Sequence, residues 1–108
     1  MRVLFDQGTP VPLRRILGHH YVKTAREEGW STLANGELLR AAAQAGFEIL
    51  VTTDKNIPYQ QNLESHRVAI VILSRNKWSL VRLRLQEIVN AVDAAKPGCC
   101  TIVEIPPR

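Results

Sequence analysis

Every residue from Val68 to Leu73 is apolar, and this run constrains the fold of the chain more than any other feature. A strand with one face in water alternates apolar and polar residues, whereas a strand covered on both faces is apolar throughout. Strands of the second kind belong mainly to parallel sheets that carry helices on both sides. The run therefore predicts a central strand of an α/β sheet.

Strand-like and helix-like segments alternate along the rest of the chain. We expect strands at 2–5, 20–24, 48–53, 68–73 and 100–105, and helices at 11–17, 36–45 and 79–95. Thr9 and Asn35 stand where N-caps of the first two helices are expected, and Gly46 stands where the second helix stops. Because helices connect parallel strands through right-handed crossovers, the pattern predicts a mostly parallel sheet of about four to five strands.

The last two expected helices carry apolar residues at helical spacing, which predicts one buried face on each. In the helix that ends at Ala45 these residues are Leu38, Leu39, Ala42 and Ala45. In the helix at 79–95 they are Val81, Leu85, Ile88, Val92 and Ala95.

Length and composition indicate one globular domain over residues 1–108. The net charge of +4 permits a polyanionic partner without establishing one. No apolar run is long enough to span a bilayer, and the first strand starts too early for a signal peptide. We expect Cys99 and Cys100 to be unpaired, small and largely buried, because adjacent strand residues face opposite sides. A cytoplasmic protein with no membrane partner is predicted.

Three acids follow the expected elements at informative places. Asp6 ends the first strand, Asp54 follows the strand at 48–53, and Glu37 lies in the first turn of a helix. Ligands of open parallel sheets bind beyond the carboxyl ends of the strands. Carboxylates gathered there repel each other, and Mg²⁺ or Mn²⁺ would relieve this and activate water against a phosphodiester. The alternatives are structural: Asp54 as a turn or cap residue, and Glu37 as a complement to the helix dipole.

Three segments around these acids resemble the PIN-like domains, short bacterial proteins related to the ribonucleases of toxin–antitoxin pairs. They are Arg2 to Pro10, Gly29-Trp30-Ser31 leading to the segment 35–39, and Leu50 to Asn56. The resemblance covers nearly the whole chain in order and spacing. It implies a PIN-like three-layer sandwich and a Mg²⁺- or Mn²⁺-dependent ribonuclease that acts on RNA. It also implies an antitoxin protein as partner and a homodimer.

Carried over to this chain, the resemblance makes Asp6, Glu37 and Asp54 the catalytic metal ligands, with Asn56 as a further oxygen ligand. Gln7 and Asn56 stand where the family usually has acids. These two departures support an alternative, a catalytically degenerate PIN-like module that binds nucleic acid or protein without turnover. A receiver-like signalling domain is a third hypothesis, although Gln7 spoils the acid pair that its chemistry needs.

Basic and aromatic residues near the acids are candidate RNA contacts. We expect Arg14, Arg15 and Lys55 to hold phosphates, and Trp30 or Tyr59 to stack on bases. The alternatives are a solvated surface for the cations and packing of the helix entry for Trp30. His19 and His20 have no metal-ligand spacing with any partner in the sequence, and we expect them to form a turn.

Overall fold

The computed structural model describes residues 1–57 and 67–107 and contains a five-stranded sheet in which all strands are parallel. Its spatial order is β2-β1-β3-β4-β5, so consecutive strands are neighbours except where the order reverses around β1. The strands are β1 (Arg2–Phe5), β2 (Tyr21–Thr24), β3 (Ile49–Thr52), β4 (Ala69–Leu73) and β5 (Cys100–Val103). The predicted α/β class with a parallel sheet is confirmed.

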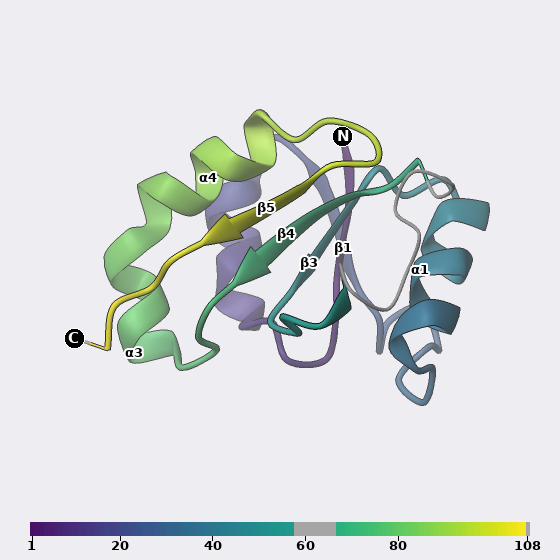
Figure 1. Cartoon of the computed structure of the whole chain (residues 1–108), viewed down its shortest axis with the longest axis horizontal. Coiled ribbons are helices and arrows are strands. Elements are labelled where there is room, and N and C mark those ends of the chain that lie inside the picture. The colour runs from purple at the N-terminus through teal and green to yellow at the C-terminus, as the bar shows by residue number, and fades with distance from the viewer. Residues whose placement is uncertain (58–66, 108) are drawn as a thin grey trace.

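Helices cover both faces of the sheet. Helix α1 (Asn35–Gln44) lies on one face, and the 3₁₀ helix η1 (Val11–Leu17) lies on the other with the segment formed by α3 (Trp78–Val81), η3 (Arg82–Arg84) and α4 (Leu85–Asp93). Figure 1 shows α1 to one side of the strands and α3 and α4 to the other. Since each face of the sheet is covered, the layers are helix, sheet and helix.

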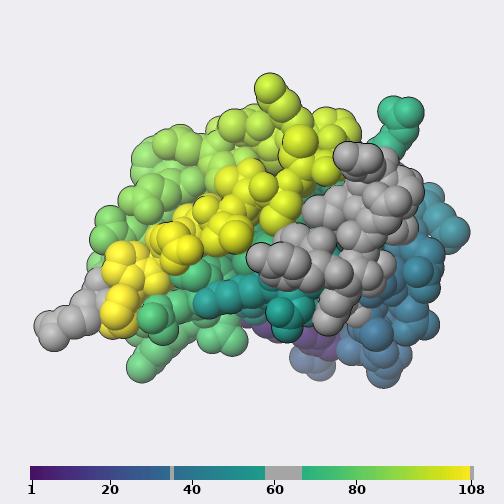
Figure 2. All heavy atoms as spheres, viewed as in Figure 1, coloured from purple at the N-terminus to yellow at the C-terminus, as the bar shows by residue number. Residues whose placement is uncertain are grey.

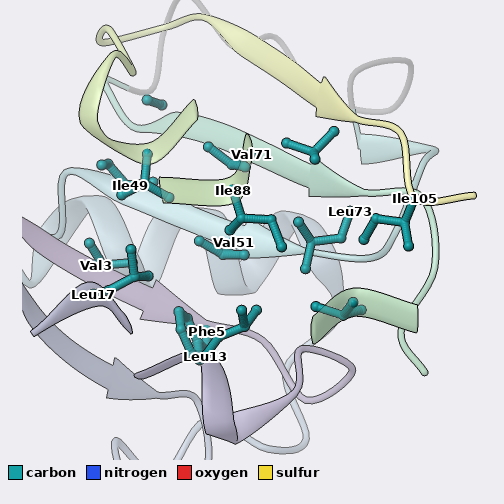
Figure 3. Packing of buried hydrophobic residues seen from close by; sticks show 14 residues of the cluster. Val3, Phe5, Leu13, Leu17, Ile49, Val51, Val71, Leu73, Ile88 and Ile105 are labelled. Atoms are coloured by element: carbon teal, nitrogen blue, oxygen red, sulfur yellow. The ribbon is translucent and has the colours of Figure 1, made fainter. Parts of the chain in front are cut away.

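The buried side chains form two clusters, one on each face of the sheet. Successive strand residues point to opposite faces, so Val3 and Phe5 belong to the cluster under η1 and α4, while Leu4 belongs to the cluster under α1. Figure 3 shows the first cluster, with Leu13 and Ile88 supplied by the helices. Strands β3 and β4 are buried at every position, as the apolar run predicts.

The two edge strands are more exposed than the three central ones. In β5, Thr101 and Ile102 are exposed, and Figure 2 shows this strand open to solvent along one face of the molecule. In β2, Tyr21 is exposed. None of the helices in the described part of the chain is long and apolar enough to cross a membrane.

Both predicted helix caps are wrong. Pro10 takes the N-cap position of η1, and the hydroxyl of Thr9 turns inward, 2.8 Å from the carbonyl oxygen of Val51. Helix α1 begins one residue early, with Ala34 as its N-cap; this residue has no side-chain acceptor, and Glu37 instead accepts the N–H of Ala34 at 3.3 Å. The capping therefore comes from inside the helix.

The predicted continuous helix at 79–95 is interrupted. Arg84 has φ −127° and ψ 31°, outside the helical region, so the i to i−4 hydrogen bonds cannot run through it. Val81, Ile88 and Val92 are nevertheless buried, as the spacing predicts. In α1 the expected apolar face stops at Ala42, because Ala45 is an exposed C-cap.

The prediction that both cysteines are buried is wrong for one of them. Both thiols are free; Cys99 is exposed in the turn before β5, whereas Cys100 is half-buried in the strand. Burial raises the pKa of the Cys100 thiol above its ordinary value, because the thiolate loses hydration there.

Candidate active site

Asp6 is held rigidly at the carboxyl end of β1 by the loop that follows it. Its Oδ1 accepts the N–H of Gly8 at 3.1 Å and lies 2.7 Å from the hydroxyl oxygen of Thr9. Its own N–H donates to the carbonyl of Val51 at 3.1 Å, which continues the pairing of β1 with β3. The side chain is only partly buried, so the carboxylate is fixed in position and still reachable from solvent.

Thr52 connects the two strand-end aspartates. It is fully buried at the end of β3; its hydroxyl donates to Oδ2 of Asp6 and accepts the N–H of Asp54 at 3.0 Å. The strands that end near Asp6 and Asp54 are neighbours, since β1 pairs directly with β3. One buried hydroxyl thereby ties the Asp6 side chain to the Asp54 backbone.

Asp54 also closes the turn that follows β3. Its Oδ1 accepts the N–H of Asn56 at 2.8 Å, the pattern of an Asx turn. Asp54 therefore has the structural turn role that was one alternative for it. Its side chain is nevertheless only partly buried. Asn56 and Lys55 are both exposed beside it.

Glu37 lies at the same end of the molecule as the two aspartates but is not joined to them. Figure 1 shows α1 starting at the end of the sheet where the loop after β1 lies. The carboxylate is exposed and turns back on the N–H of Ala34. Among the described residues, no hydrogen bond connects Glu37 with Asp6 or Asp54, so its helix-capping role is the one seen.

A small cavity of about 230 Å³ opens onto Asp6. Arg26 reaches it from the loop after β2. Beside it, Gln7 donates from its side-chain amide to the carbonyl of Ser31 at 3.2 Å and so ties the two loops together. The lining residues are Asp6, Gln7, Thr9, Val11, Thr24 and Arg26.

The predicted cationic contacts differ in how free they are. Arg14 is paired with the carboxylate of Glu27, whereas Arg15 and Lys55 are exposed. The pKa of Glu27 is lowered, first by the N–H of Thr24, which donates to it at 2.9 Å, and then by Arg14. Arg14 is thus already neutralised, and Arg15, Lys55 and Arg26 are the better candidates for phosphate.

Trp30 packs within the molecule. It is half-buried, meets Phe47 edge to face with ring centroids 6.1 Å apart, and contacts the core cluster under α1. This favours the packing alternative over stacking on bases. Tyr59, the other predicted stacking residue, lies outside the described residues.

A second, larger cavity of about 620 Å³ lies between η1 and the segment that contains α3 and α4. Val11 lines both cavities, so the two adjoin at the start of η1. The larger cavity is mostly apolar with two cations at its wall. Its lining residues are Val11, Pro12, Arg14, Arg15, Ile16, Trp78 and Leu85.

The donor set at the strand ends fits a hard divalent cation. A carboxylate offers about four acceptor positions, and the hydrogen bonds from Gly8, Thr9 and Thr52 occupy three of those on Asp6. One position stays available on Oδ2. The second carboxylate, that of Asp54, is partly exposed. Both residues offer only oxygen atoms, which are the ligands that Mg²⁺ and Mn²⁺ prefer.

Gly8 allows the Asp6 loop to pass close to β3, and we predict that Gly8→Ala disturbs the site. A Cβ at this position would lie 2.6 Å from the hydroxyl oxygen of Thr53, well inside contact distance. Relieving the clash moves the loop that holds Asp6, so we expect a loss of about 1–3 kcal/mol in unfolding free energy. Urea denaturation measures it. Gly18→Ala is the control, since its Cβ would only meet the Arg15 carbonyl at 3.5 Å; equal stability of both variants would contradict the prediction.

Comparison of the chain with models of protein families, with curated proteins and with solved structures gave no match. What the fold and the site define by themselves is an α/β protein with a parallel sheet and two aspartates at its carboxyl edge. The PIN-like family stays a prediction from the sequence.

Proposed function

We propose that this chain is a Mg²⁺- or Mn²⁺-dependent ribonuclease with a PIN-like fold. The observation that carries the proposal is the link from the Asp6 carboxylate through the Thr52 hydroxyl to Asp54. This link lies between β1 and β3, where the strand order reverses. Open α/β sheets bind their ligands at that reversal, beyond the carboxyl ends of the strands.

In this proposal Asp6 and Asp54 bind the metal ion directly. Asn56 and Glu37, from the same end of the sheet, offer further oxygen atoms around it. The ion supplies the charge that stabilises a phosphodiester under attack and lowers the pKa of water. The hydrogen bonds from Gly8 and Thr9 keep the Asp6 carboxylate from turning away. Ligands that are already fixed in position need no reorganisation when charge develops in the transition state, so they stabilise that charge more effectively.

The cations around the site suggest where the RNA backbone runs. Arg26 lines the cavity that contains Asp6, and Arg15 lines the larger cavity next to it. Phosphates bound at Arg26 and Arg15 would place the RNA strand along η1 and across Asp6. Such contacts hold the backbone without reading the sequence, so cleavage is expected to weaken as salt rises.

The alternative is a degenerate PIN-like module that binds nucleic acid or protein without catalysis. Gln7 favours it, because the residue that stands at a usual acid position is used to bind the Ser31 carbonyl. A receiver-like domain shares the strand order seen here. However, Gln7 spoils the acid pair that its chemistry needs, and β4 is followed by Ser74 and Arg75 rather than directly by a lysine.

The experiment is a cleavage assay on single-stranded and structured RNA with Mg²⁺, Mn²⁺ or a chelator. We expect cleavage with either metal and none with the chelator, since in this proposal the metal ion activates the water and stabilises the phosphodiester under attack. Binding of RNA that survives the chelator, with no turnover in any metal, would establish the degenerate module instead. An antitoxin partner and a homodimer belong to the same proposal, and copurification with the product of the adjoining gene tests the first.

A further inference from the structure

A group of side chains of metal-ligating types lies at the opposite end of the strands from the aspartates. It consists of His19 and His20, in the turn before β2, and Asp93, the last residue of α4. Figure 1 shows α4 ending near the amino terminus, at the edge where the strands begin. Because the sheet is parallel, this edge is a full strand length from the carboxyl ends that carry Asp6.

The three side chains converge on one point. Nε2 of His19 lies 2.8 Å and Nε2 of His20 lies 2.7 Å from the same oxygen, Oδ1 of Asp93. One ligand atom from each of the three residues can be chosen so that all lie within 4.8 Å of one another. The imidazole centroids are 4.0 Å apart, so the rings present their Nε2 atoms together.

The cluster is partly built into the protein. The side chain of His20 is only 5% exposed, whereas those of His19 and Asp93 are 53% and 45% exposed. Nδ1 of His20 lies 3.2 Å from the amino group of Met1, a contact that orients the ring with Nε2 toward Asp93. Two ligands are therefore open to solvent and the third is held from behind.

We propose that His19, His20 and Asp93 bind a zinc ion. Two imidazole nitrogens and one carboxylate oxygen are a common zinc donor set, and a fourth, open position is left to water. Ligands about 2.0–2.1 Å from a tetrahedral ion lie roughly 3.3 Å apart, so the nitrogen-to-oxygen separations seen here need to widen by only about half an ångström. Rotation of the exposed Asp93 and His19 side chains supplies that movement.

Zinc at this place would join the turn before β2 to the end of α4. The two segments are far apart in the sequence and are otherwise linked here by hydrogen bonds to a half-exposed carboxylate. A ligand that binds only the folded state stabilises it by mass action. The site is therefore expected to fasten this edge of the domain, independently of any chemistry at Asp6.

The test is a titration of the tag-free chain with Zn²⁺ alone, followed by calorimetry and by thermal unfolding. We expect one zinc ion at this cluster, in addition to any zinc that the Asp6 site takes up, and a higher unfolding temperature. His19→Gln and Asp93→Asn should each weaken binding at least about tenfold and abolish the thermal shift. Both replaced side chains are about half exposed, so the variants should fold, which circular dichroism without metal checks.

Two controls make the zinc proposal falsifiable apart from the proposed nuclease. Glu87→Gln removes another exposed acid of α4, one paired with Arg84, and should leave zinc binding unchanged. Asp6→Asn should also retain it, because Asp6 lies at the other edge. Absence of zinc binding to the unaltered chain, equal affinity in Asp93→Asn, or loss of all zinc binding in Asp6→Asn would overturn the site. None of these readouts depends on RNA.

Discussion

Asp6→Asn should abolish metal-dependent RNA cleavage by this chain, a loss of at least about 100-fold. The substitution removes one negative charge and the oxygen that has an acceptor position left for a cation. An amide binds Mg²⁺ far less well than a carboxylate, because the interaction with a hard cation depends mainly on charge. Initial cleavage rates at saturating Mg²⁺ measure the effect.

The structure indicates why Asp6→Asn should still fold. The amide oxygen can keep the hydrogen bonds from Gly8 and Thr9, and the amide nitrogen then faces the hydroxyl of Thr52. That hydroxyl can turn from donor to acceptor. We therefore expect a cost of only about 1 kcal/mol, the value of one ordinary hydrogen bond.

Glu87→Gln is the matched control for this prediction. It makes the same acid-to-amide change on an exposed residue of α4, so it lowers the negative charge of the chain equally. Its cleavage rate should equal that of the unaltered protein. Undiminished cleavage by Asp6→Asn would remove Asp6 from the site, and an equal loss in Glu87→Gln would trace the effect to overall charge.

Much of the fold could be predicted because burial leaves a pattern in the sequence. The apolar run at 68–73 predicts a strand covered on both faces, and β4 is buried at each position. The two aspartates were expected beyond the carboxyl ends of parallel strands, and the observed pairing of β1 with β3 makes those two strands neighbours. The caps were not predictable in the same way, since Ala34 has no side chain that signals a helix start.

The site residues that were missed depend on contacts between distant segments. Thr52 is the last residue of an otherwise apolar strand, and a hydroxyl at that place just before Asp54 is the one signal that could have revealed the bridge. Arg14 was chosen for its nearness to Asp6 in sequence, but the fold gives it Glu27 as a partner. Arg26 was not missed, because it lies near a predicted strand end, and the structure shows that it lines the cavity.

The histidine cluster shows the same limit most clearly. His19 and His20 form the predicted turn, and no spacing of metal ligands surrounds them in the sequence. Their common partner, Asp93, is 74 and 73 residues away. Only the return of α4 to the amino-terminal edge of the sheet brings the three together, and that return depends on packing of the whole domain.

Phe5→Ala should destabilise the domain by about 3–5 kcal/mol, the usual cost of removing a fully buried aromatic ring. Phe5 has no exposed surface and packs in the cluster that includes Leu13 and Val51. Figure 3 shows it between the sheet and η1. Neither the strand nor the short 3₁₀ helix can close a cavity of that size, because the backbone of β1 is paired on both sides.

That loss would be a large share of the stability of an ordinary domain, about 5–15 kcal/mol, and it would be felt at Asp6, the next residue. Urea denaturation of Phe5→Ala and Val11→Ala beside the unaltered chain tests the prediction. Val11 is 55% exposed, so its truncation should change the unfolding free energy by no more than about 0.5 kcal/mol. A cost below about 1 kcal/mol for Phe5→Ala would mean that η1 does not pack on β1 as described, and the loop that positions Asp6 would then lack its support.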